Sequence, residues 1–283
     1  MFVFLILHFM ATKDTMECIN SILDSIDYEE KRIIVVDNGS NNDSFMELKE
    51  TYENNPIVVL LRSEENLGFA RGNNIGFKYA KNYFNPSFIA MINNDTIIDQ
   101  QDFCKITINK YNTYQFSVLG PDIITKDGIH QNPWIRDGMS YKQLKIFRIK
   151  QKFRILLSFI KLDKYVYRII HNSDSRIIGK QGDILDVPLH GAALVFSEKY
   201  IKTHDGLDDR TFLYFEEEIL RSHCKNENLL MMYSSDLQIF HKEDVATKMI
   251  AKKPGIKERN EYKNRIESSK KYEELKRELG EKV

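Results

Sequence analysis

Short, almost wholly apolar runs alternate with longer segments of helical spacing through the first hundred residues, and this alternation restricts the fold more than any other feature. The apolar runs occupy 2–7, 32–37, 56–61 and 87–92, and the helical segments between them occupy 12–26, 43–52 and 68–84. Strands without polar alternation are typical of parallel strands that are covered on both faces. We therefore expect an α/β fold, a mostly parallel sheet flanked by helices, with right-handed crossovers.

The second half of the chain resumes this pattern after a basic segment. We predict a strand and then a helix within 183–201, an acidic helix start at 216–218, a strand within 229–241 and a charged helix over 256–279. The expected organisation is one domain over 1–245, with a basic helical insertion at about 140–180, followed by a C-terminal helical extension over 246–283.

The composition excludes several classes of protein. Lys plus Arg and Asp plus Glu both total 41, so no overall charge favours nucleic acid. Three widely separated cysteines form no metal or disulfide pattern, and we expect them to be buried in a protein of a reducing cytoplasm. The N-terminal apolar run is too short to cross a bilayer, so we expect a first strand there and no transmembrane segment. The sequence does not indicate an oligomeric state.

Polar side chains follow the predicted strands, and ligands of open α/β sheets bind beyond the carboxyl ends of the strands. The four strand ends read His8-Phe9, Asp37-Asn38-Gly39-Ser40, 62–66 and Asn93-Asn94-Asp95. Asp37 has two interpretations: an Asx turn that starts the next helix, or an acceptor for the base or ribose of a nucleotide.

The segment "ENLGFARGNNIGF", residues 65–77, combines small and polar residues. Gly72 and Gly76 are expected to let a helix pack closely on the sheet. Arg71, in a helix that starts beside the strand ends, could meet a diphosphate. The segment is not the dinucleotide-binding G-x-G-x-x-G motif, and the chain has no Walker-type Gly-Lys-Ser/Thr sequence.

Two acidic positions could take part in chemistry. Asp95 could cap a helix, or it could hold Mg²⁺ or Mn²⁺ against a diphosphate, since Mg²⁺ takes only one or two protein carboxylates beside substrate phosphates. The run Glu216-Glu217-Glu218 could be a plain helix N-terminus. The aromatic residues before it could instead bury a carboxyl group and raise its pKa, as suits a general base. His241, which ends a predicted strand, could cap it or bind a metal.

Six blocks in this order resemble the inverting glycosyltransferases of family two, which have the GT-A fold, and especially their rhamnosyltransferase-like and cell-surface polysaccharide branch. The blocks are "VVDNGSNNDS", "NLGFARGNNIGF", "MINNDT", "HGAALVF", "FLYFEEE" and the late His241. The similarity extends from about Phe2 to His241, and the joint order of the blocks is more specific than any one of them.

This resemblance implies a role for each candidate residue. Asp37 corresponds to the contact with the base or ribose, and Phe9 joins the nucleotide-sugar group with Asn66, Arg71 and Asn94. Asp95 corresponds to the metal-binding Asp of the family's DXD motif, whose first Asp is Asn93 here, and His241 to a second metal ligand. Gly191, Ala192 and Glu216 correspond to the acceptor side, and Glu217 to the catalytic base, where the family has Asp.

The implied reaction is transfer of a sugar from a nucleotide-sugar donor to a hydroxyl group of a glycan acceptor, with inversion and a divalent metal, in the synthesis of a surface or capsular polysaccharide. Glu216 or Glu218 could share the role of the base. Two alternatives remain: a catalytically inactive, membrane-associated scaffold with the same fold, and a sugar-phosphate nucleotidyltransferase. The latter would require a Gly-rich basic loop after the first strand, and "HFMATKD" is not one.

Nine Lys and Arg residues and one acidic residue lie between Tyr141 and Ile170, interleaved with apolar residues. This basic amphipathic segment is either a helical surface with solvated charges or a site that docks on an anionic membrane. Docking would suit a lipid-linked acceptor and a peripheral location at the inner face of the cell membrane.

Overall fold

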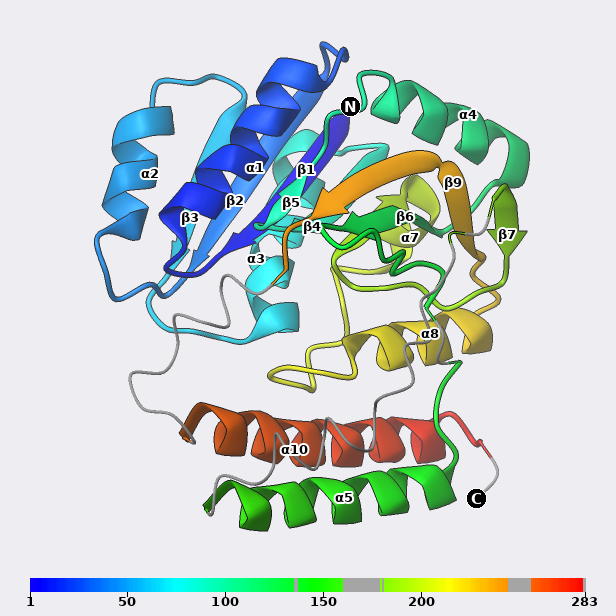
Figure 1. Cartoon of the computed structure of the whole chain (residues 1–283). Coiled ribbons are helices and arrows are strands. Elements are labelled where there is room, and N and C mark those ends of the chain that lie inside the picture. The colour runs from blue at the N-terminus through cyan, green and yellow to red at the C-terminus, as the bar shows by residue number, and fades with distance from the viewer. Residues whose placement is uncertain (135–136, 160–178, 180, 244–255, 282–283) are drawn as a thin grey trace.

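In the computed structural model, a mixed β-sheet lies between two layers of helices, and a pair of long helices lies beneath this sandwich (Figure 1). The structure describes residues 1–134, 137–159, 179, 181–243 and 256–281. The strands are β1 (Phe2–His8), β2 (Lys31–Asn38), β3 (Val58–Ser63), β4 (Phe88–Asn93), β5 (Thr96–Ile97), β6 (Val118–Thr125), β7 (Asp183–Leu185), β8 (Ala193–Ser197) and β9 (Met231–His241). The helices are α1 (Thr12–Ser25), α2 (Ser44–Tyr52), α3 (Phe69–Phe84), α4 (Phe103–Tyr114), α5 (Tyr141–Phe159), α7 (Glu198–Thr203), α8 (Glu216–Asn226) and α10 (Ile256–Glu278).

The predicted parallel half of the sheet is confirmed. Its strands run in the order β3-β2-β1-β4, and each neighbouring pair is parallel. The order then continues β8-β6-β9-β5, with β7 paired to β9. Strand β8 is antiparallel to both of its neighbours, which makes the sheet mixed.

Side chains of β1 alternate between two buried layers, which explains why its sequence carries no polar alternation. Phe2, Phe4 and Ile6 pack toward α1, α2 and α4, whereas Val3 and Leu5 pack toward α3, α7 and α8. All five side chains are inaccessible to solvent. The three cysteines are also buried and unpaired, as predicted.

Three elements between Thr96 and Thr125 were not predicted: β5, α4 and β6. Strand β6 contains Gly120, Pro121 and Asp122, which are poor strand formers and hide the strand in the sequence. Its pairing with β9 shifts register between Pro121 and Asp122, so the irregular residues coincide with an irregular ladder.

The first part of the basic segment forms α5, and its remainder, 160–170, lies outside the described residues. Helix α10 packs along α5 and also contacts α8. Leu144 of α5, Phe215 and Ile219 at α8, and Tyr272 and Leu275 of α10 form a separate apolar cluster. The division into two domains stays a prediction. No helix in the described ranges combines the length and the apolar character that a membrane span requires.

Gly72 and Gly76 provide the close approach of α3 to the sheet that their spacing predicts. A Cβ atom on Gly76 would lie 2.2 Å from Leu5 Cδ1 and 2.9 Å from Val36 Cγ2. A Cβ atom on Gly72 would lie 2.7 Å from Leu7 Cδ1. The contacts of this helix therefore leave no room for larger residues at the two positions.

We predict that Gly76→Ala lowers the free energy of unfolding by about 1–3 kcal/mol, because overpacking a filled interface forces neighbouring side chains to move. The sign is informative, since Gly→Ala within a helix otherwise stabilises by about 1 kcal/mol. Urea denaturation measures the difference. Lys78→Ala, on the exposed side of the same helix, is the control and should change stability little. A stabilised Gly76→Ala variant would contradict the observed packing.

Candidate functional site

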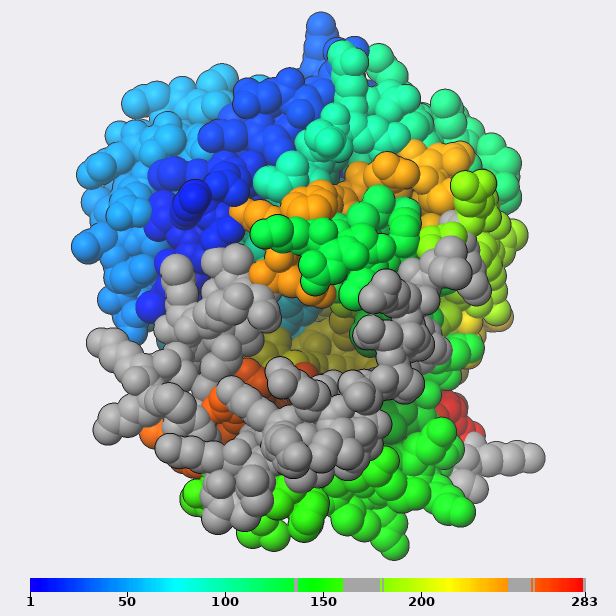
Figure 2. Space-filling model, in the orientation of Figure 1, coloured from blue at the N-terminus to red at the C-terminus, as the bar shows by residue number. Residues whose placement is uncertain are grey.

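A cleft of about 840 Å³ lies at the carboxyl ends of β1, β2 and β4. Figure 2 shows this region as a hollow between the sheet and the α5–α10 pair. The sheet side is formed by strand-end residues, and the opposite side by residues 212–214 and by α10. The lining includes Leu7, Phe9, Asn38, Asn66, Asn93, Asn94, Asp95, Gln131, His190, Phe212, Leu213, Tyr214, His241, Glu243, Glu258, Glu261 and Arg265.

Asp95 and His241, which are remote in sequence, meet in this cleft. The short strand β5 pairs antiparallel with the end of β9, where Thr96 lies opposite His241. This pairing places His241 Nε2 3.2 Å from Asp95 Oδ1. Both side chains are almost buried, although they line the cleft. The structure thus brings together the two residues that were predicted as metal ligands.

Two further side chains orient the His241 ring. Gln131 Nε2 lies 2.5 Å from a carboxylate oxygen of Glu243, which can only accept a hydrogen bond. The Gln131 amide oxygen therefore faces His241 Nδ1, at 2.7 Å, and must accept its proton. In the neutral ring this leaves the Nε2 lone pair directed at the Asp95 carboxylate. Two acceptors at this separation require a proton or a cation between them.

The Asp95–His241 pair fits a small divalent cation. A carboxylate oxygen and a histidine nitrogen fixed by an outer hydrogen bond are suitable ligands. Over the described ranges, no group of three or more His, Cys, Asp and Glu side chains is arranged to bind a metal. Two protein ligands are nevertheless enough for Mg²⁺ or Mn²⁺ where substrate phosphates complete the coordination.

The loop that carries Asp95 is held in place by hydrogen bonds to α1 and within its own turn. Asn94 Nδ2 donates to Thr15 Oγ1 at 3.0 Å, and His8 Nδ1 lies 2.7 Å from the same oxygen. Thr96 Oγ1 donates to the Asn93 carbonyl oxygen at 2.7 Å and closes the turn. Because its amide is used in this way, Asn94 positions the loop through α1.

Glu217 reaches the same end of the sheet through Gly191. The Asn93 N–H donates to the Ala192 carbonyl oxygen at 2.9 Å, which places the start of β8 beside the Asp95 loop. The adjacent Gly191 N–H donates to Glu217 Oε1 at 3.2 Å. A Cβ atom on Gly191 would lie 2.7 Å from that oxygen, so glycine gives the carboxylate its space.

The three consecutive glutamates occupy different environments. Glu216 and Glu218 are buried, whereas Glu217 is partly exposed. Thr211 Oγ1 donates to Glu216 Oε1 at 3.0 Å. Burial, with the nearby charge of Glu217, raises the pKa of Glu216 from its ordinary 4.5 to about 8. Glu216 is therefore protonated at neutral pH and supports the helix start, and its burial does not favour direct contact with an acceptor.

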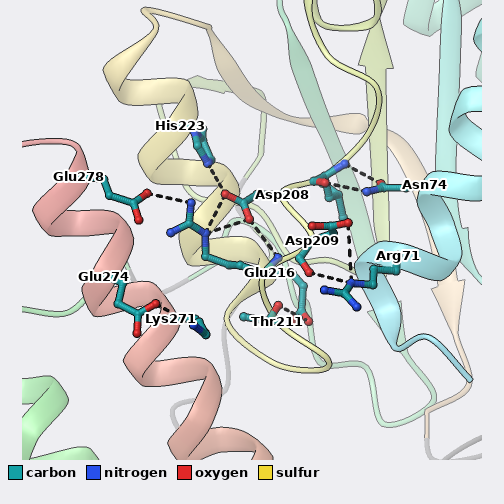
Figure 3. A network of polar contacts seen from close by, with 12 residues as sticks. Arg71, Asn74, Asp208, Asp209, Thr211, Glu216, His223, Lys271, Glu274 and Glu278 are labelled. Carbon is teal, nitrogen blue, oxygen red and sulfur yellow. Dashed lines mark hydrogen bonds and ion pairs between the residues drawn. The ribbon is translucent and has the colours of Figure 1, made fainter.

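The loop before α8 is fixed by polar contacts on both sides (Figure 3). The Asn74 side chain exchanges two hydrogen bonds of 2.8 Å with the Leu207 backbone. Asp208 accepts hydrogen bonds from the backbone N–H and from Nε of Arg210, and it contacts His223. At the end of the loop, Tyr214 and Phe215 have left-handed φ angles of 76° and 72°. Such conformations cost on the order of 1–3 kcal/mol each and require support from their surroundings.

Asp37, Asn66 and Arg71 lie around the cleft in different ways. Asn66 lines it and accepts a hydrogen bond from Asn38 Nδ2 at 3.2 Å. Asp37 is buried just outside the lining, and its Oδ2 lies 3.2 Å from Arg62 Nε yet receives no hydrogen bond from a described residue. Arg71 is half exposed and donates to the Asp209 carbonyl oxygen at 3.2 Å (Figure 3).

Comparison with known proteins identifies the family. Residues 6–168, more than half of the chain, match the sequence profile described as "Glycosyl transferase family 2". The chain belongs to this family. One relative is the low-salt glycan biosynthesis hexosyltransferase Agl10 of Haloferax volcanii. Its sequence is 22% identical to this chain over 216 residues. The match covers 75% of the chain and 59% of Agl10, so the chain spans less than two thirds of that relative.

Solved structures share the GT-A fold of this family 2 chain. GalNAc-T7 with UDP, GalNAc and Mn²⁺ superimposes with a TM-score of 0.59 at 11% identity, over 86% of this chain and 44% of that one. Residues 1–349 of S. aureus TarS in complex with UDP superimpose with a TM-score of 0.53 at 16% identity, over 94% of this chain and 72% of that one. The chain covers 36% of a longer TarS structure.

Several residues of this family 2 site were not singled out from the sequence. Burial, with the neighbouring His241, lowers the pKa of His190 to about 4, so the ring is neutral where it lines the cleft. It belongs to the "HGAALVF" block, which could have indicated it. Glu258, Glu261 and Arg265 come from α10, which was expected to be an extension. A charged helix gives no sign in its sequence that one face borders a distant cleft.

We predict that wild type becomes less stable as the pH rises from 6.5 to 8, and that Glu216→Gln does not. The pKa of this carboxyl group is 4.5 when exposed and about 8 in the fold, so folding takes up a proton between these values. Its contribution to stability is therefore complete below pH 4.5 and is lost as the pH rises through 8. The pKa values of His8 and His190, lowered by burial from 6.5 to about 4, affect stability only below pH 6.5.

Thermal melting at half-unit steps from pH 6.5 to 8 measures this effect. Wild type should lose melting temperature steadily, and Glu216→Gln should stay level. The control is Glu50→Gln, an exposed position on α2 that should keep the wild-type slope. Equal slopes for Glu216→Gln and wild type would show that Glu216 is ionised in the fold.

Proposed function

We propose that this chain transfers a sugar from a nucleoside diphosphate sugar to a hydroxyl group of a glycan acceptor, with inversion at the anomeric carbon. The observation that carries the proposal is a backbone connection at the end of the sheet. The Asn93 N–H donates to the Ala192 carbonyl oxygen, next to the Gly191 N–H that binds Glu217, and Asp95, two residues after Asn93, contacts His241 in the cleft. Family membership supports sugar transfer. The UDP and UDP-GlcNAc complexes of TarS support a nucleotide-sugar donor.

The nucleotide would bind along the ends of β1 and β2. Asp37 Oδ2 receives no hydrogen bond from a described residue, although Arg62 Nε lies 3.2 Å from it. If the adjacent end of the cleft opens to it, an N–H of a base or a ribose hydroxyl would supply the missing donor. Asn38 and Asn66 hold each other at this end of the cleft and give it a fixed shape. Phe9 lines the same region and would offer an aromatic surface to the base.

The diphosphate would lie at Asp95 and His241, which would hold Mg²⁺ or Mn²⁺. When bound, such an ion neutralises charge on the leaving diphosphate. Asp95 and His241 are prearranged for this task by β5, Gln131 and Glu243. Arg71 would have to release Asp209 before it could contact a phosphate.

Glu217 would act as the general base. The Gly191 N–H stabilises its ionised form, and the neutral Glu216 adds no competing charge beside it. The acceptor hydroxyl group gives its proton to Glu217 as its oxygen bonds to the anomeric carbon. The bond from that carbon to the diphosphate oxygen breaks on the opposite face, and the nucleoside diphosphate leaves. Inversion follows from this single displacement.

The acceptor would approach along the aromatic side chains of Phe212 and Tyr214, which line the side of the cleft opposite the sheet, toward Gly191 and Ala192 at the start of β8. Aromatic faces and hydrogen-bonding groups together suit a sugar. The relation to Agl10, a glycan biosynthesis hexosyltransferase, supports a glycan as the acceptor. A lipid-linked acceptor, a surface polysaccharide as the product and a location at the inner face of the cell membrane are part of the proposal.

We predict that Glu217→Gln lowers turnover by about 10²–10⁴-fold, since general-base catalysis contributes this much to a rate. Donor affinity should be nearly unchanged, because the base contacts the acceptor. Donor consumption and isothermal titration with the nucleotide sugar measure the two effects. Glu227→Gln, at the far end of the same helix region, is the matched control and should keep wild-type turnover. Loss of donor binding in Glu217→Gln would make Glu217 a structural residue.

We predict that one nucleoside diphosphate raises the melting temperature of the protein in the presence of Mn²⁺ and much less in its absence. A ligand that binds only the folded state stabilises it in proportion to the logarithm of its concentration over Kd. A thermal-shift panel of UDP, GDP, ADP and CDP, each with Mn²⁺ or with EDTA, measures this. Asp95→Asn should abolish the part of the shift that depends on Mn²⁺. A shift that is the same with EDTA would remove the metal from the proposed donor site.

A further inference from the structure

Helix α5 carries apolar side chains on two opposite sides. One side, which includes Leu144, packs on α10 and α8. The other side faces solvent and consists of residues spaced three, four and three positions apart, which places them on one stripe of the helix. Each of them is 43–65% exposed: Ile146, Ile149, Phe153 and Leu156.

Lysines border this stripe. Helix α5 contains six Lys and Arg residues and no acidic residue. Arg148 is turned inward, where it pairs with Glu273 of α10 at 2.5 Å. In the described part of the chain, no acidic side chain pairs with the exposed lysines, which are Lys142, Lys145, Lys150 and Lys152.

From this arrangement, we propose that the outer face of α5 docks on a lipid bilayer that contains anionic lipids. An apolar stripe with Phe and Leu between rows of lysine matches helices that lie in the plane of a membrane interface. Acyl chains would accept the apolar side chains, and anionic headgroups would pair with the lysines. The uniform positive charge of α5 disfavours a second copy of this chain, because two such faces would repel each other.

The location of α5 gives this docking a consequence for the cleft. Helix α5 is the outermost element at the bottom of Figure 1, and α10 lies between it and α8. The inner neighbour α10 contributes Glu258, Glu261 and Arg265 to the cleft. Packed helices lie roughly 8–10 Å apart, so a bilayer on the outer face of α5 would be about two helix layers from the cleft. The cleft of the docked protein could then reach a lipid-linked substrate while the protein stays on the membrane.

Flotation of the full-length protein with lipid vesicles tests the proposal. Wild type should float with vesicles of phosphatidylcholine and phosphatidylglycerol and stay behind with phosphatidylcholine alone. A variant with Gln at all four lysines, Lys142, Lys145, Lys150 and Lys152, should bind anionic vesicles at least ~10-fold more weakly. A second variant, Ile149→Ser with Phe153→Ser and Leu156→Ser, should lose binding to a similar extent, because insertion of the stripe would be lost.

The matched control replaces four exposed lysines elsewhere with Gln: Lys49, Lys78, Lys126 and Lys199. Equal losses in this control and in the α5 lysine variant would overturn the proposal, as would wild type that does not float with anionic vesicles. Light scattering tests whether a second copy of the chain covers this face instead. If wild type is a dimer, the serine variant is a monomer and the variant still binds vesicles, the face is a dimer interface and the proposal is wrong. The substituted side chains are exposed and lie outside the cleft, so sugar transfer to a soluble acceptor should persist whatever the vesicle result.

Discussion

The hydrogen bond from the Asn93 N–H to the Ala192 carbonyl oxygen joins the two halves of this site. It continues the antiparallel pairing of β4 with β8 past the Ile92–Ala193 pair, at the last residue of β4. On one side of this bond, the chain turns into Asp95 and the β5 strand that meets His241. On the other side, the Gly191 N–H donates a hydrogen bond to the Glu217 carboxylate. The residues proposed to hold a cation and to act as the base are therefore linked through one backbone hydrogen bond between the end of β4 and the start of β8.

The neighbouring residues Glu216 and Glu217 have different surroundings, since Glu216 is buried and Glu217 is partly exposed. Glu216 lies under the loop and is protonated, because burial disfavours its charged form. Glu217 projects one residue further along the helix, where a backbone N–H is directed at its carboxylate. Two ionised carboxylates at this point would repel each other and weaken the helix start. The environment, and not the residue type, therefore makes Glu216 unsuited to the proposed role of general base.

The sequence predicted the parallel half of the sheet, because wholly apolar strands and the helices between them follow simple periodicities. Through the resemblance, it also predicted that Asp37, Arg71, Asp95 and Glu217 surround one cleft. The structure places Asp95 in the cleft beside His241, and the joint action of the other residues stays a prediction. It missed β6, whose Gly-Pro-Asp sequence resembles a turn, and the roles of Gln131 and Glu243. These two residues act by fixing the ring of His241, which depends on the relative positions of three segments and leaves no local pattern.

The left-handed backbone at Tyr214 and Phe215 connects the site to the helix pair. Two consecutive non-glycine residues in this conformation are stable only if something holds them, and Phe215 is held in the apolar cluster with Leu144 of α5 and Tyr272 of α10. Tyr214 in turn lies under Arg265, whose guanidinium carbon is 4.1 Å from the ring centre. The charged helix that follows the sheet in sequence thus stabilises the strained turn that starts α8, the helix on which Glu217 lies.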